Sequence, residues 1–195
     1  NMKILGINAC GWLEVAHDAS AVLVEDGKIK WAIEEERLIR QKRAYDKKPI
    51  NAIHFCLNNE GILLDEIDRI VFSWDWKNYG PEEAKKFETS RFLLDKFFPK
   101  KYFNYKKKPN IAFVEHHLAH ASSTFRCSGF KDAAILVIDG QGEYCSSSIW
   151  LGEKDGTIQH IWNNDIENSL GFFYSAACRY IGMDNGDEGK LMGLA

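Results

Sequence analysis

The chain has 195 residues, of which 45% are hydrophobic and 27% are charged, and its net charge at pH 7 is -3. This composition is typical of a folded globular protein with one or two domains, and it gives no general attraction to nucleic acid or to an anionic membrane. The one basic run, at residues 100–108, alternates with aromatic residues. We interpret it as a solvated lysine loop over buried aromatic rings, and not as a nucleic-acid groove.

No apolar run reaches the roughly 18 residues that a membrane span needs, and the apolar start of the chain is typical of a strand and not of a signal peptide. The five cysteines are scattered and contain no C-x-x-C pair, which argues against a disulfide framework or a zinc knuckle. We therefore expect a cytoplasmic protein.

The first predicted group of elements begins with three strands, and Asp26-Gly27 supplies the hairpin turn between the second and the third. Pro49 opens a helix at its first position and Gly61 ends it. The strands are expected at 3–10, 20–25, 28–34, 69–74 and 110–115, and further helices at 81–98 and from the histidines at 116 to about 126. The acidic run 34–36 is interpreted as the solvated end of a strand, with one carboxylate available to orient a lysine.

A second group repeats this order with strands at 133–139, 146–152 and 157–162, followed by a helix at 169–180. A repeated β-β-β-α unit predicts an α/β fold of the duplicated actin-like, ribonuclease H-like kind that sugar kinases and heat-shock ATPases share. We place the boundary near residue 130, so that 1–130 forms the first sub-domain and 131–195 the start of the second. Because the second copy is incomplete, we expect a fragment of a longer protein.

The most informative local pattern is Glu115-His116-His117-Leu118-Ala119-His120, where a strand passes into a helix. Residues four apart share one helical face, so His116 and His120 can point at the same position. Asp139 ends the first strand of the second repeat. Two imidazoles and one carboxylate would form an open three-ligand site for iron(II), manganese or zinc. The alternatives are hydrogen-bonded histidines and a turn-capping aspartate.

Four segments, in order along the chain, resemble the O-carbamoyltransferases that include nodulation-factor and antibiotic-carbamoylating enzymes. They are His17-Asp18-Ala19-Ser20-Ala21 with Glu34-Glu35-Glu36-Arg37 and Arg40-x-Lys42, then Glu115–Ala121, then Asp139-Gly140-Gln141-Gly142-Glu143, and finally Glu188–Ala195. The resemblance implies an actin-like domain that binds iron and nucleotide. It also implies a second, carboxy-terminal domain, absent here, that converts carbamoyl phosphate and ATP to carbamoyl adenylate.

The resemblance assigns roles to individual positions. His116, His120 and Asp139 match the metal ligands, and a further aspartate ligand is expected beyond Ala195. His17 matches a histidine beside the acceptor hydroxyl, where it would act as the base. The remaining positions are Lys42, which would neutralise the leaving phosphate, and Gly140, Gly142, Lys190 and Gly193, which would lie toward ATP or carbamoyl adenylate.

The expected activity is ATP-dependent transfer of a carbamoyl group to a hydroxyl of a sugar-containing small molecule, such as a nodulation sugar, an aminoglycoside, a nucleoside or a polysaccharide precursor. The fragment alone is expected to be inactive. Two alternatives stay open: a tRNA threonylcarbamoyl-transfer enzyme of the same fold, and a non-catalytic nucleotide switch of the actin or chaperone kind. Three aromatic residues are candidates for a sugar-stacking surface, although a role in the core or at its rim is preferred: Trp74, Trp76 and Tyr79.

Overall fold

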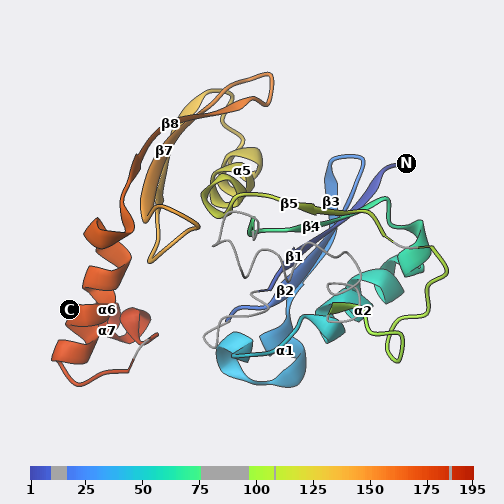
Figure 1. Cartoon of the computed structure of the whole chain (residues 1–195), viewed down its shortest axis with the longest axis horizontal. Coiled ribbons are helices and arrows are strands. Elements are labelled where there is room, and N and C mark those ends of the chain that lie inside the picture. The colour runs from blue at the N-terminus through green and yellow to red at the C-terminus, as the bar shows by residue number, and fades with distance from the viewer. Residues whose placement is uncertain (10–16, 76–96, 108, 185) are drawn as a thin grey trace. The chain divides into compact units, whose positions relative to one another are not determined.

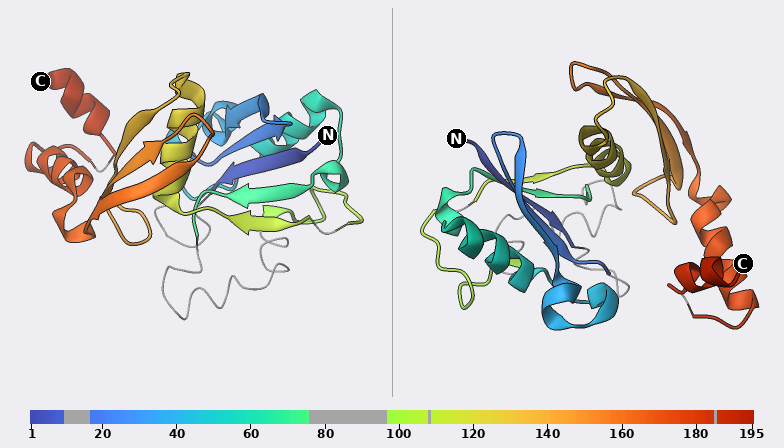
Figure 2. Two further views of the ribbon diagram at one scale, coloured as in Figure 1. Left: turned by 90° about the horizontal axis from the view of Figure 1, so that it is seen from above. Right: turned by 180° about the vertical axis from the view of Figure 1, so that it is seen from behind.

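The computed structural model describes residues 1–195 except for 10–16, 76–96, 108 and 185. Contacts divide the chain into two compact units, Asn1–Val114 and Glu115–Ala195, which are described here one at a time. Figures 1 and 2 show their helices and strands from three directions. Within the described residues, no helix is both long and apolar enough to cross a membrane.

The first unit is built on a five-stranded sheet in the order β3-β2-β1-β4-β5. Strands β1, β2 and β3 form an antiparallel meander, and β4 and β5 continue the sheet parallel to β1. Asp26 and Gly27 both take positive φ, which gives the tight turn that this meander needs. The strands span Lys3–Asn8 (β1), Ser20–Glu25 (β2), Lys28–Glu34 (β3), Arg69–Phe72 (β4) and Ile111–Phe113 (β5).

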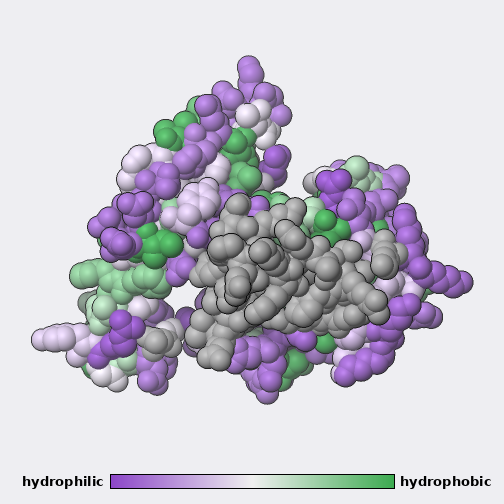
Figure 3. Space-filling model, in the orientation of Figure 1, coloured by the Kyte–Doolittle hydropathy of each residue, from purple (hydrophilic) through white to green (hydrophobic). Residues whose placement is uncertain are grey.

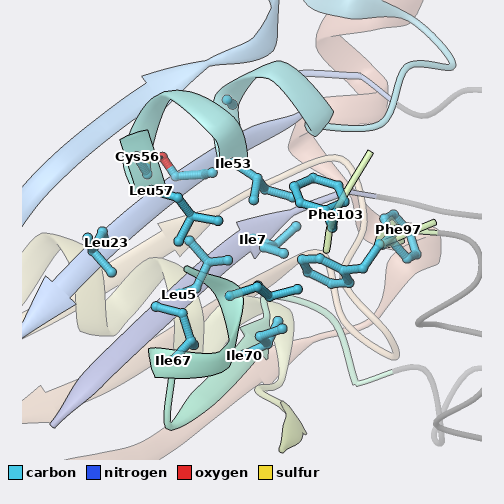
Figure 4. Packing of buried hydrophobic residues seen from close by; sticks show 14 of the residues in the cluster. Leu5, Ile7, Leu23, Ile53, Cys56, Leu57, Ile67, Ile70, Phe97 and Phe103 are labelled. Carbon is cyan, nitrogen blue, oxygen red and sulfur yellow. Dashed lines mark hydrogen bonds between the residues drawn. The ribbon is translucent and has the colours of Figure 1, made fainter. Parts of the chain in front are cut away.

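Helix α2 (Ile50–Glu60) covers one face of this sheet and forms the core of the first unit with it. Its buried residues Ile53 and Leu57 point toward inward-facing side chains of the sheet, among them Leu5 and Ile70 (Figure 4). Gly61 follows the last residue of the helix and caps its end, as predicted. Its φ of 72° is the left-handed conformation that favours glycine. The short 3-10 helices of this unit span Lys42–Ala44 and Leu64–Glu66.

The prediction that residues 34–36 form a solvated strand end holds for Glu34, the half-exposed last residue of β3, but was wrong for Glu35. The chain turns into helix α1 (Glu35–Ile39), and the Glu35 side chain is buried, with 2% of the residue exposed. Its carboxylate accepts hydrogen bonds from Asn51 Nδ2 at 2.6 Å and from the Ala52 N–H at 2.8 Å. The start of α2 has N–H groups without partners in the helix, and this carboxylate satisfies them. Pro49 precedes the helix instead of forming its first residue.

The aromatic residues of the basic run are buried as expected at two of their three positions, whereas Tyr102 is exposed. Phe103 and Tyr105 are buried in the core of the first unit, and the ammonium groups of Lys100 and Lys101 lie over tyrosine rings. These lysine charges therefore interact with the faces of the tyrosine rings. The helix predicted at 81–98 lies almost entirely outside the described residues.

The second unit has a three-stranded antiparallel sheet in the order β6-β7-β8. Helix α5 packs on one face, where Ala121 and Phe125 contact Ile135, Val137 and Trp150. On the strands, Leu136, Ile138, Leu151 and Trp162 remain exposed, and Figure 3 shows hydrophobic surface over this unit. The elements span His116–Ser128 (α5), Ala133–Ile138 (β6), Ser147–Gly152 (β7), Ile158–Asn164 (β8), Ile166–Asn168 (a 3-10 helix), Leu170–Tyr180 (α6) and Glu188–Leu194 (α7).

The order β-β-β-α therefore occurs twice, and the first copy carries two additional parallel strands on the far side of β1. This arrangement confirms the predicted α/β class and the repeated β-β-β-α order from which the actin-like, ribonuclease H-like kind was predicted. The boundary between the two compact units lies between residues 114 and 115, so α5 is in the same unit as β6 and β7. The division into actin-like sub-domains near residue 130 stays a prediction.

Candidate functional site

Two histidines and one aspartate bring three side-chain donor atoms together in the second unit. His116 and His120 lie one turn apart on α5, and Asp139 directly follows β6. Nε2 of His116 lies 2.9 Å from Oδ2 of Asp139 and 3.1 Å from Nε2 of His120. Nε2 of His120 lies 3.4 Å from the same carboxylate oxygen. The structure thus gathers the three predicted ligands within the second compact unit.

These distances fit a shared divalent cation. Metal–ligand bonds of about 2.0–2.2 Å with angles between tetrahedral and octahedral values place neighbouring ligand atoms about 2.8–3.6 Å apart. The three donor atoms lie within 4.8 Å of one another, and each pair falls in that range. Two imidazoles and one carboxylate with open positions suit iron(II) and related metals. The side chains of His120 and Asp139 are 49% and 34% exposed, which leaves room for further ligands.

The electrostatics of Asp139 suit a metal ligand. Burial by itself would raise the pKa of this carboxyl, but hydrogen bonds with His116, with His120 and with the Gly140 N–H outweigh it and lower the pKa well below its ordinary range. Asp139 is therefore an anion at any physiological pH. A carboxylate supplied in this form does not have to release a proton before it binds a metal.

Two carboxylates cap the helix that carries the histidines. Glu115 accepts hydrogen bonds from the N–H groups of His117 and Leu118, at 3.0 and 2.8 Å. Glu143, from the loop between β6 and β7, accepts from the N–H of His116 at 2.9 and 3.1 Å. The three N–H groups at the start of α5 are therefore satisfied by charge-assisted hydrogen bonds.

His117 turns away from the candidate ligands, as the helical spacing predicts, and is fully buried. Its Nδ1 lies 2.8 Å from Oγ of Ser148, which also accepts a hydrogen bond from the Trp150 indole at 2.7 Å. Burial lowers the pKa of His117 to about 4, and the nearby His116 imidazole acts in the same direction. His117 is thus a neutral packing residue of the second unit.

The first unit holds the two candidate catalytic residues, His17 and Lys42. They lie on two segments that a backbone hydrogen bond connects. The N–H of Asp18 donates to the carbonyl of Arg43 at 2.7 Å, and the Glu36 carboxylate accepts from the N–H of Arg43. Nδ1 of His17 lies 2.6 Å from Oδ2 of Asp18, its neighbour in the connection between β1 and β2. Both His17 and Lys42 are exposed. The base and phosphate-neutralising roles stay predictions.

Comparison with known proteins decides the family. The family model described as carbamoyltransferase N-terminus matches residues 3–195. The chain belongs to this carbamoyltransferase family. It is 36% identical over 98% of its length to the uncharacterized protein sll1178 of Synechocystis sp., of which it covers 34%. It is 35% identical over 92% of its length to the nodulation protein NolNO of Sinorhizobium fredii, of which it covers 27%.

The chain therefore spans about a quarter to a third of the length of these curated relatives. Among solved structures it is similar to YeaZ from Pseudomonas aeruginosa, with 13% sequence identity and a TM-score of 0.46. That similarity covers 84% of this chain and 66% of that one.

In this carbamoyltransferase chain, Gly140 and Gly142 have packing roles that the structure makes visible. A Cβ at Gly142 would lie 2.7 Å from the His117 ring, and a Cβ at Gly140 would lie 3.3 Å from the Phe172 ring. Ser169, which caps α6, donates to the carbonyl of Gly140 at 2.7 Å. The loop after Asp139 is thus held closely by its surroundings, and its contact with nucleotide stays a prediction.

The other two nucleotide candidates, Lys190 and Gly193, lie on α7, a short helix that the sequence did not predict. Lys190 is exposed and pairs with Asp187 at 2.7 Å, one turn earlier. Of the aromatic candidates for sugar stacking, Trp74 packs against the core of the first unit, and Trp76 and Tyr79 lie outside the described residues.

Sequence reasoning gave no role to three residues that support the candidate metal ligands. They are Glu143, His117 and Ser169. Glu143 belongs to the segment Asp139-Gly140-Gln141-Gly142-Glu143, but no local pattern indicates that its partner is a helix start 27 residues earlier. Nor does a local pattern identify His117 or Ser169, whose partners lie about 30 residues away.

Proposed function

We propose that this chain is the metal-binding part of an ATP-dependent O-carbamoyltransferase, which moves a carbamoyl group from carbamoyl phosphate, through carbamoyl adenylate, to a hydroxyl of a sugar-containing small molecule. Membership of the carbamoyltransferase family supports the transferase class. The observation that carries the proposal is the convergence of His116, His120 and Asp139.

These three side chains would hold a divalent metal, with iron(II) as our first choice because mixed imidazole and carboxylate donors suit it. When bound, the metal would supply Lewis-acid stabilisation of the negative charge that develops on carbonyl or phosphate oxygens.

His17 is the proposed base. With the proton on Nδ1 directed at the Asp18 carboxylate, 2.6 Å away, Nε2 is the nitrogen that accepts the proton of the acceptor hydroxyl. The hydroxyl oxygen forms a bond to the carbamoyl carbon, and the bond between that carbon and the phosphate oxygen breaks. The products are the O-carbamoyl ester, AMP and a protonated His17. Asp18 stabilises that imidazolium and orients the ring.

Lys42 adds positive charge for the departing phosphate. Its segment is attached to the His17 segment through the bond from Asp18 to Arg43, and the Glu36 carboxylate holds the Arg43 N–H. The backbone hydrogen bond keeps the segments of the base and the cation next to each other. The loop at Gly140 and Gly142, together with Lys190 and Gly193, is the proposed contact region for ATP or the adenylate.

The direct test is metal binding by the chain with and without its donors. His116→Ala/His120→Ala should abolish stoichiometric binding of iron(II) or Co2+, measured by elemental analysis after anaerobic loading and desalting. His160→Ala, which removes an imidazole on β8, is the matched control and should bind as the wild type does. Full metal occupancy in the double variant would reject the site.

The role of His17 needs the complete enzyme. His17→Ala should slow carbamoyl transfer to the acceptor by about 10²–10⁴-fold while leaving formation of carbamoyl adenylate unchanged. The two steps are separated by following pyrophosphate release and carbamoylated product. Unchanged transfer would reject His17 as the base.

A further inference from the structure

Glu143 lies in the loop between β6 and β7 but directs its carboxylate at another element, helix α5. Both of its oxygens accept from the N–H of His116, and only 8% of the residue is exposed. A carboxylate is costly to bury unless it is paired or hydrogen-bonded. Here a backbone N–H and the positive end of a 13-residue helix compensate for the burial.

The two caps of α5 differ in what they connect. Glu115 caps His117 and Leu118, two and three residues further along the same chain segment. Glu143 caps His116 from 27 residues away. Glu115 therefore stabilises only the helix start, whereas Glu143 also fixes the helix against the loop after β6.

That loop begins at Asp139, the carboxylate of the candidate metal site. Its backbone is held on one side by Ser169, which donates to the carbonyls of Asp139 and Gly140. On the other side Gly142 lies against the His117 ring, where a Cβ would be only 2.7 Å from Cδ2. Glu143 adds the direct link to the backbone of His116.

We propose that Glu143 is a positioning residue of the metal site: it sets the distance between the helix that carries His116 and His120 and the loop that carries Asp139. The inference rests on the proposed metal-binding role of those three residues. Partners that orient metal ligands typically contribute about 10–100-fold in metal affinity. Because Glu143 acts through the His116 backbone, its loss lowers affinity without removing a ligand.

The test is a Co2+ titration of the chain, followed by the visible absorption of the bound ion. Glu143→Ala should raise the Kd for Co2+ by about 10–100-fold and change the absorption spectrum, because the three donors no longer hold one geometry. Glu115→Ala is the matched control, since it removes a cap from the same helix end without affecting the Asp139 loop. Its Kd should rise by less than about tenfold, with the wild-type spectrum.

Thermal unfolding of both metal-free variants shows whether the two caps contribute comparably to the fold. An equal Kd for Glu143→Ala and Glu115→Ala would overturn the inference, because Glu143 would then be an ordinary helix cap. If Glu143→Ala does not fold, Glu143→Gln keeps the length and one acceptor oxygen and should give an intermediate Kd. A wild-type Kd and spectrum in Glu143→Gln would then overturn the inference. Failure of the wild-type chain to bind Co2+ would overturn the proposed metal role as well.

Discussion

In the first unit the candidate catalytic groups belong to irregular backbone, whereas in the second unit the candidate metal ligands lie at the ends of regular elements. Asp18, Arg43 and Ala44, beside His17 and Lys42, all take positive φ. Such conformations are costly for residues other than glycine and persist only where the surroundings impose them. His116, His120 and Asp139 instead occupy ordinary positions on α5 and after β6.

The two units also differ in what stabilises these positions. Among the described residues, the first unit has the larger hydrophobic core. Side chains from its sheet and from α2 pack there together with several phenylalanines. The second unit has a small apolar core, and buried polar groups such as His117, Glu143 and Ser148 take part in holding it. A large core contributes enough stability to offset the strain of loops such as those beside His17 and Lys42. In the second unit, the positions of the candidate metal ligands depend more on individual hydrogen bonds.

The largest expected effect tests the difference between the cores. Leu5→Ala in the first unit should lower the free energy of unfolding by about 4 kcal/mol, because the residue is fully buried and its truncation leaves a cavity. Ile135→Ala, in the smaller core, should lower it by about 2 kcal/mol. Urea unfolding of both variants measures the two values. Equal losses would show that the cores are equally tight.

Metal should stabilise the second unit through its three donors. A divalent metal at 100 times its Kd should add about 2.7 kcal/mol to the free energy of unfolding, because it binds the folded state. The same concentration should add almost nothing in Asp139→Asn, which keeps the side-chain shape but loses the anionic ligand. The measurement is urea unfolding with Co2+ and with a chelator. Equal stabilisation of both proteins would place the metal elsewhere.

A somewhat smaller effect tests the buried carboxylate of the first unit. Glu35→Ala should lower the free energy of unfolding by about 2 kcal/mol, because the Ala52 N–H and the Asn51 side chain lose a buried acceptor. Glu34→Ala is the control. It removes a neighbouring, half-exposed carboxylate that pairs with Arg37 on the surface, and it should cost less than about 1 kcal/mol. The reverse ranking would restore the solvated interpretation of the acidic run.

The smallest expected effect concerns strain. Arg40 follows α1 with φ 59° and ψ 32°, a conformation that favours glycine. Arg40→Gly should therefore raise the free energy of unfolding by about 0.5–1 kcal/mol. Arg37→Gly, inside α1, should lower it by about 1 kcal/mol. Thermal unfolding of both variants measures the two changes in stability. Destabilisation by Arg40→Gly would mean that the arginine side chain stabilises the fold by more than the backbone strain destabilises it.

Local patterns were enough to predict most of the described elements, because alternation, helical spacing and turn residues act within a few neighbours. The spacing of His116 and His120 placed them on one face of a helix, and the position of Asp139 after an apolar strand made it a candidate ligand. Within the acidic run at 34–36, Glu35 was the clear failure. The local pattern of the acidic run continues a strand. The donors to the buried Glu35 carboxylate belong to a helix about 16 residues later.

The sequence alone therefore determined which residues have the chemistry for a metal site and which repeated elements carry them. Only the tertiary structure decided that the three donor atoms meet within hydrogen-bonding distance, that Glu143 caps the helix of His116, and that Glu35 is buried. The physical reason is range: a helix face depends on residues four apart, whereas each of these contacts joins segments that the chain brings together only when its cores form.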